Sequence, residues 1–219
     1  MDSSYLHRKF IHRINPDRVH IIFECGSRDC LDAIELSKYY KDSKVYAFEC
    51  NPEALSLCKT NLNGIPNIHL IEKAVSNVNG KVDFYATDME KSTNKELGAS
   101  SMLWHRDNEN EFFQKKIEVE SIRLDTFMRQ EHLPQIDLLC MDVQGVEMLV
   151  FEGLGEMLHR VKYIITEVVF EHYYTGDVLF KDVVQYLDKN GFSLLIGSGL
   201  LGNRKAGLTN CLFKNNKRV

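Results

Sequence analysis

Short apolar runs alternate with stretches of helical periodicity along most of the chain. Runs rich in β-branched and aromatic residues predict strands at 19–24, 44–49, 68–72, 136–141, 163–168, 192–196 and 209–213. Apolar positions three and four residues apart predict helices at 29–41, 52–63, 146–158 and 180–189. Because strands that alternate with helices form mainly parallel sheets, the pattern predicts an α/β fold.

Two parts of the chain depart from this alternation. Asn79 and Gly80 predict a tight turn that leads into a further strand at 81–85, and an edge-like strand follows at 117–124. The polar stretch 86–116 between them is long for a connection and is either a lid over a site or a surface loop. The last two predicted strands are joined by a glycine-rich loop without a helix, so we expect them to pair antiparallel.

The first residues of the chain predict a short amphipathic helix packed on the domain. Leu6, Phe10 and Ile14 recur at helical spacing among basic residues. A membrane or nucleic-acid arm is the alternative interpretation of this segment. The chain is thus divided into an N-terminal helical extension, one domain and a tail, at 1–18, 19–214 and 215–219.

Composition narrows the class of protein. With 219 residues, of which 44% are apolar and 26% charged, the chain is long enough to bury a core in one domain. The formal net charge of −4 offers no global attraction to nucleic acid or to an anionic membrane. No apolar run approaches the roughly 18 residues of a membrane span, and no signal peptide is visible, so we expect a cytoplasmic protein without a membrane partner. The six cysteines are scattered, which favours reduced, mostly buried thiols.

Acidic side chains stand where several of the predicted strands end. Glu24, Glu49, Asp142 and Glu167 each lie at such a position. In an open α/β sheet, ligands bind outside the carboxyl ends of the strands. The sequence therefore places the candidate site at this edge of the sheet.

The first two strand ends predict the class of cofactor. A carboxylate at Glu49 could accept both hydroxyls of a ribose. A dinucleotide pyrophosphate needs three glycines in the first loop, but this loop has only Gly26, with Arg28 and Cys30 where further glycines are wanted. Glu24 adds a negative charge that suits a sulfonium with an α-ammonium group. These residues favour S-adenosyl-L-methionine over NAD.

Five segments carry a resemblance to a known family. They are IDLLCMDVQGVEMLVFEGL, VYAFECNPEAL, EKAVSNVNGKVDFY, GASSM and VESIRLDTF. They resemble the FkbM family of S-adenosylmethionine-dependent methyltransferases, and the D-V-x-G-x-E block at 142–147 is the most specific of them. The resemblance implies a Rossmann-like methyltransferase fold with seven main strands and helices on both faces. It also implies O-methylation, most often of a sugar hydroxyl in a glycan or natural product.

The resemblance also implies a set of cofactor-binding residues. They are Glu24, Gly26 and Ser27 for the methionine end, Glu49 and Asn51 for the ribose, Ala74 and Val75 beside the adenine, and Ser101 with Asp142 close to the cofactor. Two positions depart from the family pattern. Cys30 replaces a second small residue, and Gln144 replaces an acid, which weakens any role of that acid in catalysis or metal binding.

Candidate catalytic residues follow the central strands. Asp142 is the first choice for the base that removes the proton of an acceptor hydroxyl, although a helix-capping role is the alternative. His172 is a second candidate, as a base or as a residue that binds the acceptor. Trp104, Tyr173 and Tyr174 are suited to stacking on a sugar ring, and the predicted acceptor site is completed by Glu167 and Glu171.

Several alternatives remain open at the level of sequence. Asp142, Glu167 and Glu171 could instead hold a divalent cation, although the sequence does not favour a metal. The acceptor could be RNA or protein rather than a carbohydrate, since Arg106, Lys115 and Lys116 could form a local basic rim. A non-catalytic, cofactor-binding domain is a third hypothesis. The chain is also compatible with a domain of a larger glycan-modifying enzyme.

Overall fold

The computed structural model of the protein describes residues 3–93, 95–106, 112–197 and 207–218. Its strands are β1 (Ile21–Cys25), β2 (Lys44–Phe48), β3 (Ile68–Ile71), β4 (Ala74–Val75), β5 (Gly80–Thr87), β6 (Gln114–Ile122), β7 (Ile136–Met141), β8 (Val161–Val169), β9 (Phe192–Gly197) and β10 (Leu208–Asn215). Its α-helices are α1 (Arg8–Ile11), α2 (Leu31–Tyr39), α3 (Pro52–Asn61), α4 (Leu124–Gln130), α5 (Glu147–Leu154) and α6 (Phe180–Lys189). Short 3-10 turns are η1 (Ser4–Leu6), η2 (Pro16–Arg18), η3 (Leu97–Ala99) and η4 (Gly155–Arg160).

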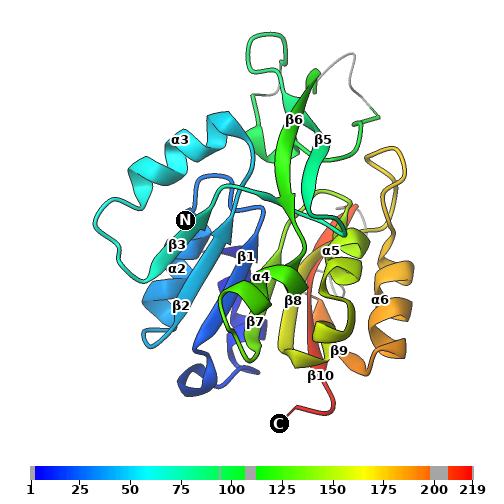
Figure 1. The fold of residues 1–219 in the computed structure, drawn as a ribbon. Coiled ribbons are helices and arrows are strands. Elements are labelled where there is room, and N and C mark those ends of the chain that lie inside the picture. The colour runs from blue at the N-terminus through cyan, green and yellow to red at the C-terminus, as the bar shows by residue number, and fades with distance from the viewer. Residues whose placement is uncertain (1–2, 94, 107–111, 198–206, 219) are drawn as a thin grey trace.

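Seven of the described strands form the main sheet, in the order β3-β2-β1-β7-β8-β10-β9 (Figure 1). The first five in that order run parallel, and β10 pairs antiparallel with both β8 and β9. The predicted α/β class, with a mainly parallel sheet and an antiparallel last strand, is confirmed. The chain reverses its winding direction between β1 and β7, which places the topological switch point at their carboxyl ends.

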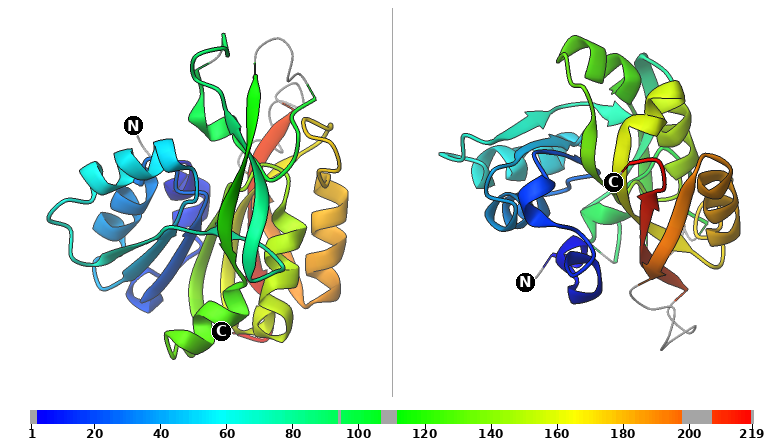
Figure 2. Two further views of the ribbon diagram at one scale, coloured as in Figure 1. Left: turned by 45° about the horizontal axis from the view of Figure 1, so that its top comes forward. Right: turned by 90° about the horizontal axis from the view of Figure 1, so that it is seen from below.

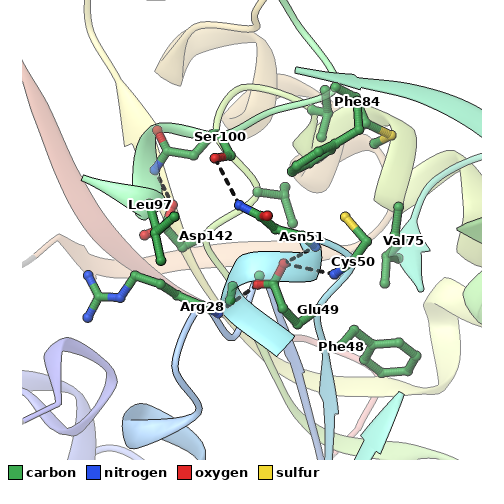
Figure 3. A pocket seen from close by; sticks show the side chains of 18 of the residues that line it. Arg28, Phe48, Glu49, Cys50, Asn51, Val75, Phe84, Leu97, Ser100 and Asp142 are labelled. Atoms are coloured by element: carbon green, nitrogen blue, oxygen red, sulfur yellow. Dashed lines mark hydrogen bonds between the residues drawn. The ribbon is translucent and has the colours of Figure 1, made fainter. Parts of the chain in front are cut away.

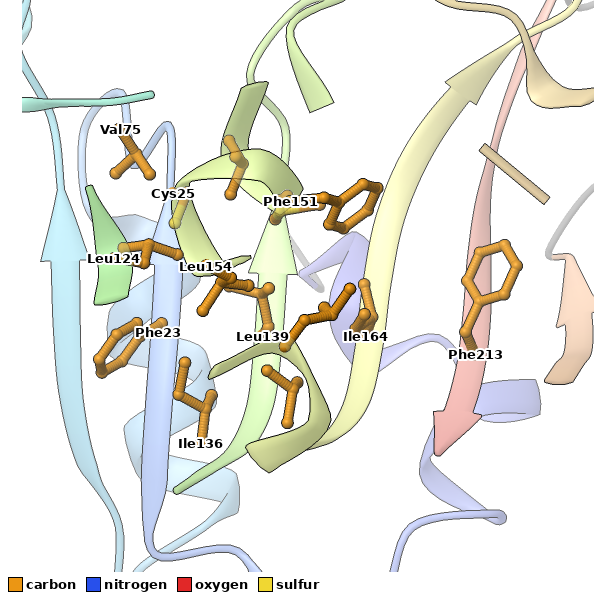
Figure 4. Close-up of a cluster of buried hydrophobic side chains, with 14 of the residues drawn as sticks. Phe23, Cys25, Val75, Leu124, Ile136, Leu139, Phe151, Leu154, Ile164 and Phe213 are labelled. Atoms are coloured by element: carbon orange, nitrogen blue, oxygen red, sulfur yellow. The ribbon is translucent and has the colours of Figure 1, made fainter. Parts of the chain in front are cut away.

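Successive residues of the central strands are buried on opposite faces of the sheet. On one face, Phe23 and Leu139 pack with apolar side chains of α4, α5 and α6 (Figure 4). On the other face, Ile22 and Leu138 pack with α2, α3 and the N-terminal segment. Helices thus cover both faces, as Figure 2 shows from below. Parallel strands that are buried on both faces have nearly continuous apolar sequences, and for this reason these strands could be predicted.

A second, three-stranded sheet in the order β4-β6-β5 stands above the carboxyl ends of the main sheet (Figure 1). The hairpin partners β5 and β6 are antiparallel along their whole length, and β4 joins β6 in parallel through Ala74 and Val75. Arg123, directly after β6, donates to the carbonyl oxygen of Asn77 at 2.8 Å and pairs with Asp125 at 2.9 Å. These contacts fix the second sheet at the edge where the candidate site is expected.

The structure differs from the sequence prediction at one strand end, and it defines two segments more closely, the stretch 86–116 and the N-terminus. The strand expected to end at Leu124 ends at Ile122, and a helix, α4, begins at Leu124. The stretch 86–116 contains the end of β5, the turn η3 and the start of β6, while residues 94 and 107–111 lie outside the described residues. At the N-terminus, α1 is a single turn between η1 and η2, with Phe10 and Ile14 buried.

The burial of the cysteines and the length of the helices are two further features of the fold. All six cysteines are unpaired, and every one except Cys50 is fully buried, as expected for reduced thiols in a core. Among the described helices, none has both the length and the apolar character that a membrane crossing requires.

Candidate functional site

The site lies where β1 and β7 end side by side. The backbone N–H of Asp142 donates to the carbonyl oxygen of Cys25 at 3.0 Å. Gly26 follows with a φ of +85°, and a Cβ at this position would overlap the carbonyl oxygen of Asp142. Only glycine fits this close approach, so the single glycine of the first loop sets the distance between the two strand ends.

Glu49 holds the first loop in place. Its Oε2 accepts from the backbone N–H of Arg28 at 2.7 Å, and its Oε1 accepts from those of Cys50 at 2.8 Å and Asn51 at 2.7 Å. Arg28 and Cys30 both adopt positive φ, at 52° and 61°. The loop thus adopts left-handed backbone conformations at two positions where the residue is not glycine. Burial raises the pKa of Glu49, and the three backbone donors oppose that shift.

Glu24 lies beneath the same loop. Its carboxyl group is 1% exposed and is hydrogen-bonded to the hydroxyl of Ser27. Burial raises the pKa of Glu24 to about 8, and the hydrogen bond from Ser27 shifts the pKa in the opposite direction. Glu24 lines neither of the two cavities described below, whereas Gly26 lines both and Ser27 lines the larger one. Its direct role in this structure is to shape the loop.

A small cavity of about 70 Å³ lies between the ends of β1 and β2 and the second sheet (Figure 3). Glu49 and Asn51 line one side of it, and the Asn51 amide donates to the hydroxyl of Ser100 at 3.3 Å. Ala74 and Val75 line another side. The remaining wall is largely apolar and includes Phe48, Ala54, Phe84, Leu97, Met102 and Val146. Polar groups and an apolar surface are thus next to each other in this cavity.

A larger cavity of about 550 Å³ adjoins the small one, and the two share Gly26, Arg28, Gly98, Asp142 and Gln144. Its size falls in the ordinary range of ligand sites. The other residues that line it are Tyr5, Ser27, Asp32, Glu96, Ala99, His105, Phe112, Gly145, Glu147, Glu167, Val169, Tyr173, Tyr174, Asp177 and Leu208. Of the predicted acceptor residues, Glu167, Tyr173 and Tyr174 are therefore brought together here.

Gln144, which replaces an acid of the family pattern, connects two groups of the site. Its Nε2 donates to Oδ1 of Asp142 at 2.6 Å, and its Oε1 accepts from the hydroxyl of Tyr174 at 2.8 Å. The Ser101 hydroxyl donates to the backbone carbonyl of Gln144 at 2.7 Å. Burial raises the pKa of Asp142, and the amide of Gln144 opposes this by stabilising the carboxylate. A second acid at position 144 could not donate this bond.

The large cavity is acidic. Burial, with the neighbouring charge of Asp142 as a smaller cause, raises the pKa of Glu147 to about 7 and that of Glu167 to about 8. Among the described residues that line the cavity, Arg28 is the only lysine or arginine. Such a lining disfavours an anionic ligand and accommodates a neutral or cationic one.

Three predicted acceptor residues do not line either cavity. His172 is hydrogen-bonded through Nδ1 to Asp177, whose other oxygen accepts from the backbone N–H of Tyr173 at 2.8 Å. Asp177 itself lines the large cavity, so His172 lies behind its wall. Trp104 is 40% exposed and packs edge-on against Tyr85. Glu171 is the third predicted acceptor residue that lines neither cavity.

The basic residues expected to form a rim have local partners. Lys115 pairs with Glu53, and Lys116 pairs with Asp83, each at 2.7 Å. The Nε of Arg106 donates to the backbone carbonyl of Tyr174 at 3.2 Å. Within the described part of the chain, histidine, cysteine and carboxylate side chains do not gather in a group of three that could hold a metal ion.

Several residues that line the large cavity escaped the sequence interpretation, and two of them, Tyr5 and Asp32, come from the first part of the chain. Tyr5 reaches it from η1, and Asp32 reaches it from the first turn of α2. Asp32 carried a signal, because it stands in the first helical turn after the first loop, where helices of such sheets face the ligand. Tyr5 carried none, since its neighbours in space are far from it in the chain.

Comparisons with known proteins agree with this architecture. A family model described as the methyltransferase FkbM domain matches residues 24–194. The chain is 28% identical over 190 residues to the 2-O-methyltransferase NoeI of Sinorhizobium fredii (strain NBRC 101917 / NGR234), covering 84% of this chain and 77% of that protein.

Solved structures share the fold at low sequence identity. Methyltransferase FkbM from Methylobacillus flagellatus KT matches with a TM-score of 0.55 and 10% identity, over 90% of this chain and 43% of that chain. A Streptococcus mutans protein in complex with SAH matches with a TM-score of 0.51 and 13% identity, over 90% and 89% of the two chains. The Rossmann-like fold implied by the sequence is thereby confirmed.

Proposed function

Because this chain belongs to the FkbM methyltransferase domain family, we propose that it transfers a methyl group from S-adenosyl-L-methionine to a sugar hydroxyl of a glycan or glycoside. The observation that carries this proposal is the pair of adjoining cavities that share Asp142 at the switch point of the sheet. One cavity suits a nucleoside, and the other suits a neutral acceptor. The 28% identity to a 2-O-methyltransferase supports transfer to oxygen.

The lining of the small cavity matches the chemistry of the nucleoside part of the cofactor. Oε2 of Glu49 accepts one hydrogen bond within the described residues, from the N–H of Arg28, and keeps capacity for a ribose hydroxyl, since each carboxylate oxygen has two acceptor sites. Asn51 lies beside it, and Ala74 and Val75 offer an apolar contact for the adenine. Gly26 and Ser27 belong to the loop that faces the methionine end.

The same residues argue against a dinucleotide. A pyrophosphate needs backbone N–H groups of a glycine-rich loop pointing at the ligand. Here the N–H of Arg28 is occupied by Glu49, and the surrounding lining is acidic. A zwitterionic sulfonium carries no phosphate and meets neither obstacle.

Asp142 is placed to act as the base in this proposal. The bound cofactor supplies an activated methyl group on a positively charged sulfur. Asp142 lines both cavities and accepts the proton that the acceptor hydroxyl loses as its oxygen is methylated. Gln144 keeps the carboxylate oriented through its 2.6 Å bond. Tyr173, Tyr174 and Glu167 bind the acceptor in the large cavity.

His172 is the alternative base. Its Nδ1 is fixed by Asp177, which leaves Nε2 as the free ring nitrogen. The position of His172 behind the cavity wall makes Asp142 the better candidate. The occupied partners of Lys115 and Lys116, together with the acidic lining, also make a polyanionic acceptor such as RNA the weaker choice.

Calorimetric titration with S-adenosylhomocysteine, with NAD as the competing ligand, tests the cofactor. We expect binding of the homocysteine nucleoside, no binding of NAD, and a loss of affinity in Glu49→Gln. Glu49→Gln is preferable to Glu49→Ala, because alanine would leave three backbone N–H groups without their acceptor. Glu53→Gln, in the first turn of α3 and outside the lining of both cavities, is the matched control.

Transfer of a labelled methyl group to a panel of acceptors tests the reaction. The panel contains neutral glycans, amino-sugar glycans, uronic-acid glycans and RNA. We expect label on a hydroxyl of a neutral or amino-sugar glycan and a large loss of rate in Asp142→Asn. Label on RNA alone, or binding of NAD in place of the homocysteine nucleoside, would contradict the proposal.

A further inference from the structure

The N-terminal segment contributes a wall of the large cavity. Tyr5 in η1 is 3% exposed and lines this cavity together with Gly26, Ser27 and Asp32. Its ring belongs to the same buried cluster as Phe10, which anchors the segment on the sheet face that α2 covers. A side chain outside the alternating α/β unit therefore reaches the end of the first loop.

The hydroxyl of Tyr5 lacks a protein partner. Within 3–93, 95–106, 112–197 and 207–218, no donor or acceptor is hydrogen-bonded to it; the one hydrogen bond of this residue to a side chain runs from its backbone N–H to Ser3, at 3.2 Å. Buried tyrosine hydroxyls are ordinarily hydrogen-bonded. Burial and the nearby charges of Asp142 and Glu24 raise its pKa, so the hydroxyl keeps its proton and can donate it to an acceptor.

Asp32 faces the same end of the cavity. Its carboxylate has no hydrogen bond or ion pair with any residue of the described ranges, and its side chain is half-buried at the start of α2. Glu24, the other acid of this region, is bonded to Ser27 and does not line the cavity. Asp32 is therefore the unpaired carboxylate that a ligand next to the first loop would meet.

We propose that Asp32 and Tyr5 together bind the amino-acid end of the methyl donor, the Asp32 carboxylate accepting from the α-ammonium and the Tyr5 hydroxyl donating to the α-carboxylate. This inference rests on the proposed function. A zwitterion presents both groups side by side, so one acceptor and one donor at one end of a cavity match it. The N-terminal segment is then part of the cofactor site.

A pair of ligands isolates this contact from the rest of the site. S-adenosylhomocysteine carries the amino-acid end, whereas 5′-deoxy-5′-methylthioadenosine has the same nucleoside and thioether but lacks it. Calorimetry of the full chain with both ligands gives a ratio of affinities for each variant. The variants are Tyr5→Phe, which removes the hydroxyl, and Asp32→Asn, which removes the negative charge; both keep the shape of the side chain.

We expect each variant to weaken S-adenosylhomocysteine about tenfold or more, since a hydrogen bond to a charged group is lost. Binding of the methylthio nucleoside is expected to stay within about twofold, because the affected contact is absent from it. The controls are Tyr186→Phe and Asp188→Asn, which lie on α6 away from both cavities and from the N-terminal segment. The controls are expected to leave both affinities unchanged.

The outcomes separate the two levels of the argument. If the unaltered protein binds neither nucleoside, the proposed function fails. If it binds both and the variants keep the same ratio of affinities, this inference is wrong and the proposed function stands. An equal loss of affinity for both ligands would mean that Tyr5 and Asp32 have a structural role only, and it would also overturn the inference. Thermal unfolding of each variant checks this structural role.

Discussion

At the scale of single residues, the carboxyl groups of the site serve the fold as well as the ligand. Glu49 accepts three backbone N–H groups, and Glu24 holds the hydroxyl of Ser27. The position of these acids could be read from the sequence, because strand ends are the place where ligands bind. The hydrogen-bond partners of these acids could not be read from the sequence. Arg28 and Ser27 reach them because the loop has positive φ at Arg28 and Cys30, which the residue types do not predict.

The buried carboxyl of Glu24 makes the stability of the protein depend on pH. Its pKa is about 8 in the folded chain and 4.5 in the ordinary state of the group. Between these values the folded state binds a proton that the unfolded state has released. The free energy of unfolding therefore falls as pH rises from about 5 to about 8, with a slope of up to ~1.4 kcal/mol per pH unit from this group.

Glu24→Gln removes this dependence. Glutamine remains neutral at all pH values and can still accept from Ser27, so the variant is expected to gain stability relative to the unaltered protein as pH rises from about 5 to about 8. Urea denaturation at several pH values measures the difference. Glu118→Gln, at an exposed ion pair with Lys81, is the control. Parallel stability profiles for Glu24→Gln and the unaltered protein would show that Glu24 is ionised in the fold.

At the scale of elements, α5 packs unusually close to the strand that opens the second sheet. A Cβ at Gly153 of α5 would overlap the backbone carbonyl oxygen of Ser76, just after β4. Replacing glycine by alanine inside a helix ordinarily stabilises it by up to ~1 kcal/mol. Here we expect the opposite sign for Gly153→Ala, a loss of about 1–3 kcal/mol, because α5 must move away from Ser76.

Chemical denaturation measures that loss. Ser56→Ala, at an exposed position of α3, serves as the control, because it raises helix propensity without a steric conflict. A stabilised Gly153→Ala protein would mean that α5 has room to shift and that the second sheet is not held by this contact.

The elements that the sequence predicted are those whose pattern is local. The run 136–141 is apolar at nearly every position because β7 is buried on both faces, and it was recognised as a central strand. Helix α4 was missed because it begins two residues after β6, so Leu124 was assigned to the strand. The spacing of Leu124, Phe127 and Met128 was the available signal for this helix.

Strand β4 could not be anticipated from its own residues. It has only two residues, Ala74 and Val75, and exists through parallel pairing with Ser121 and Ile122 of β6. Such a contact depends on the path of the whole chain between them. Both residues line the small cavity, and their contact with an adenine stays a prediction.

At the scale of the whole molecule, the candidate site is assembled from segments that are distant in the chain. The ends of β1, β2 and β7 supply its floor, and the second sheet with η3 supplies its roof (Figure 3). The N-terminal segment closes one end through Tyr5. A cofactor that fills both cavities would therefore contact the main sheet and the second sheet together.

Hydrogen exchange with and without S-adenosylhomocysteine tests this arrangement. A ligand that binds only the folded state stabilises it by about 2.7 kcal/mol at a concentration 100 times its Kd, and the segments in contact are also shielded directly. We expect slower exchange in 26–30, 49–51, 97–102 and 142–147, which surround the two cavities. The far end of α6, at 183–189, lines neither cavity and serves as the internal reference for global stabilisation. Protection at 26–30 and 49–51 without any excess at 97–102 would mean that η3 and the residues after it do not cover the cofactor, and the proposed roof of the site would then be wrong.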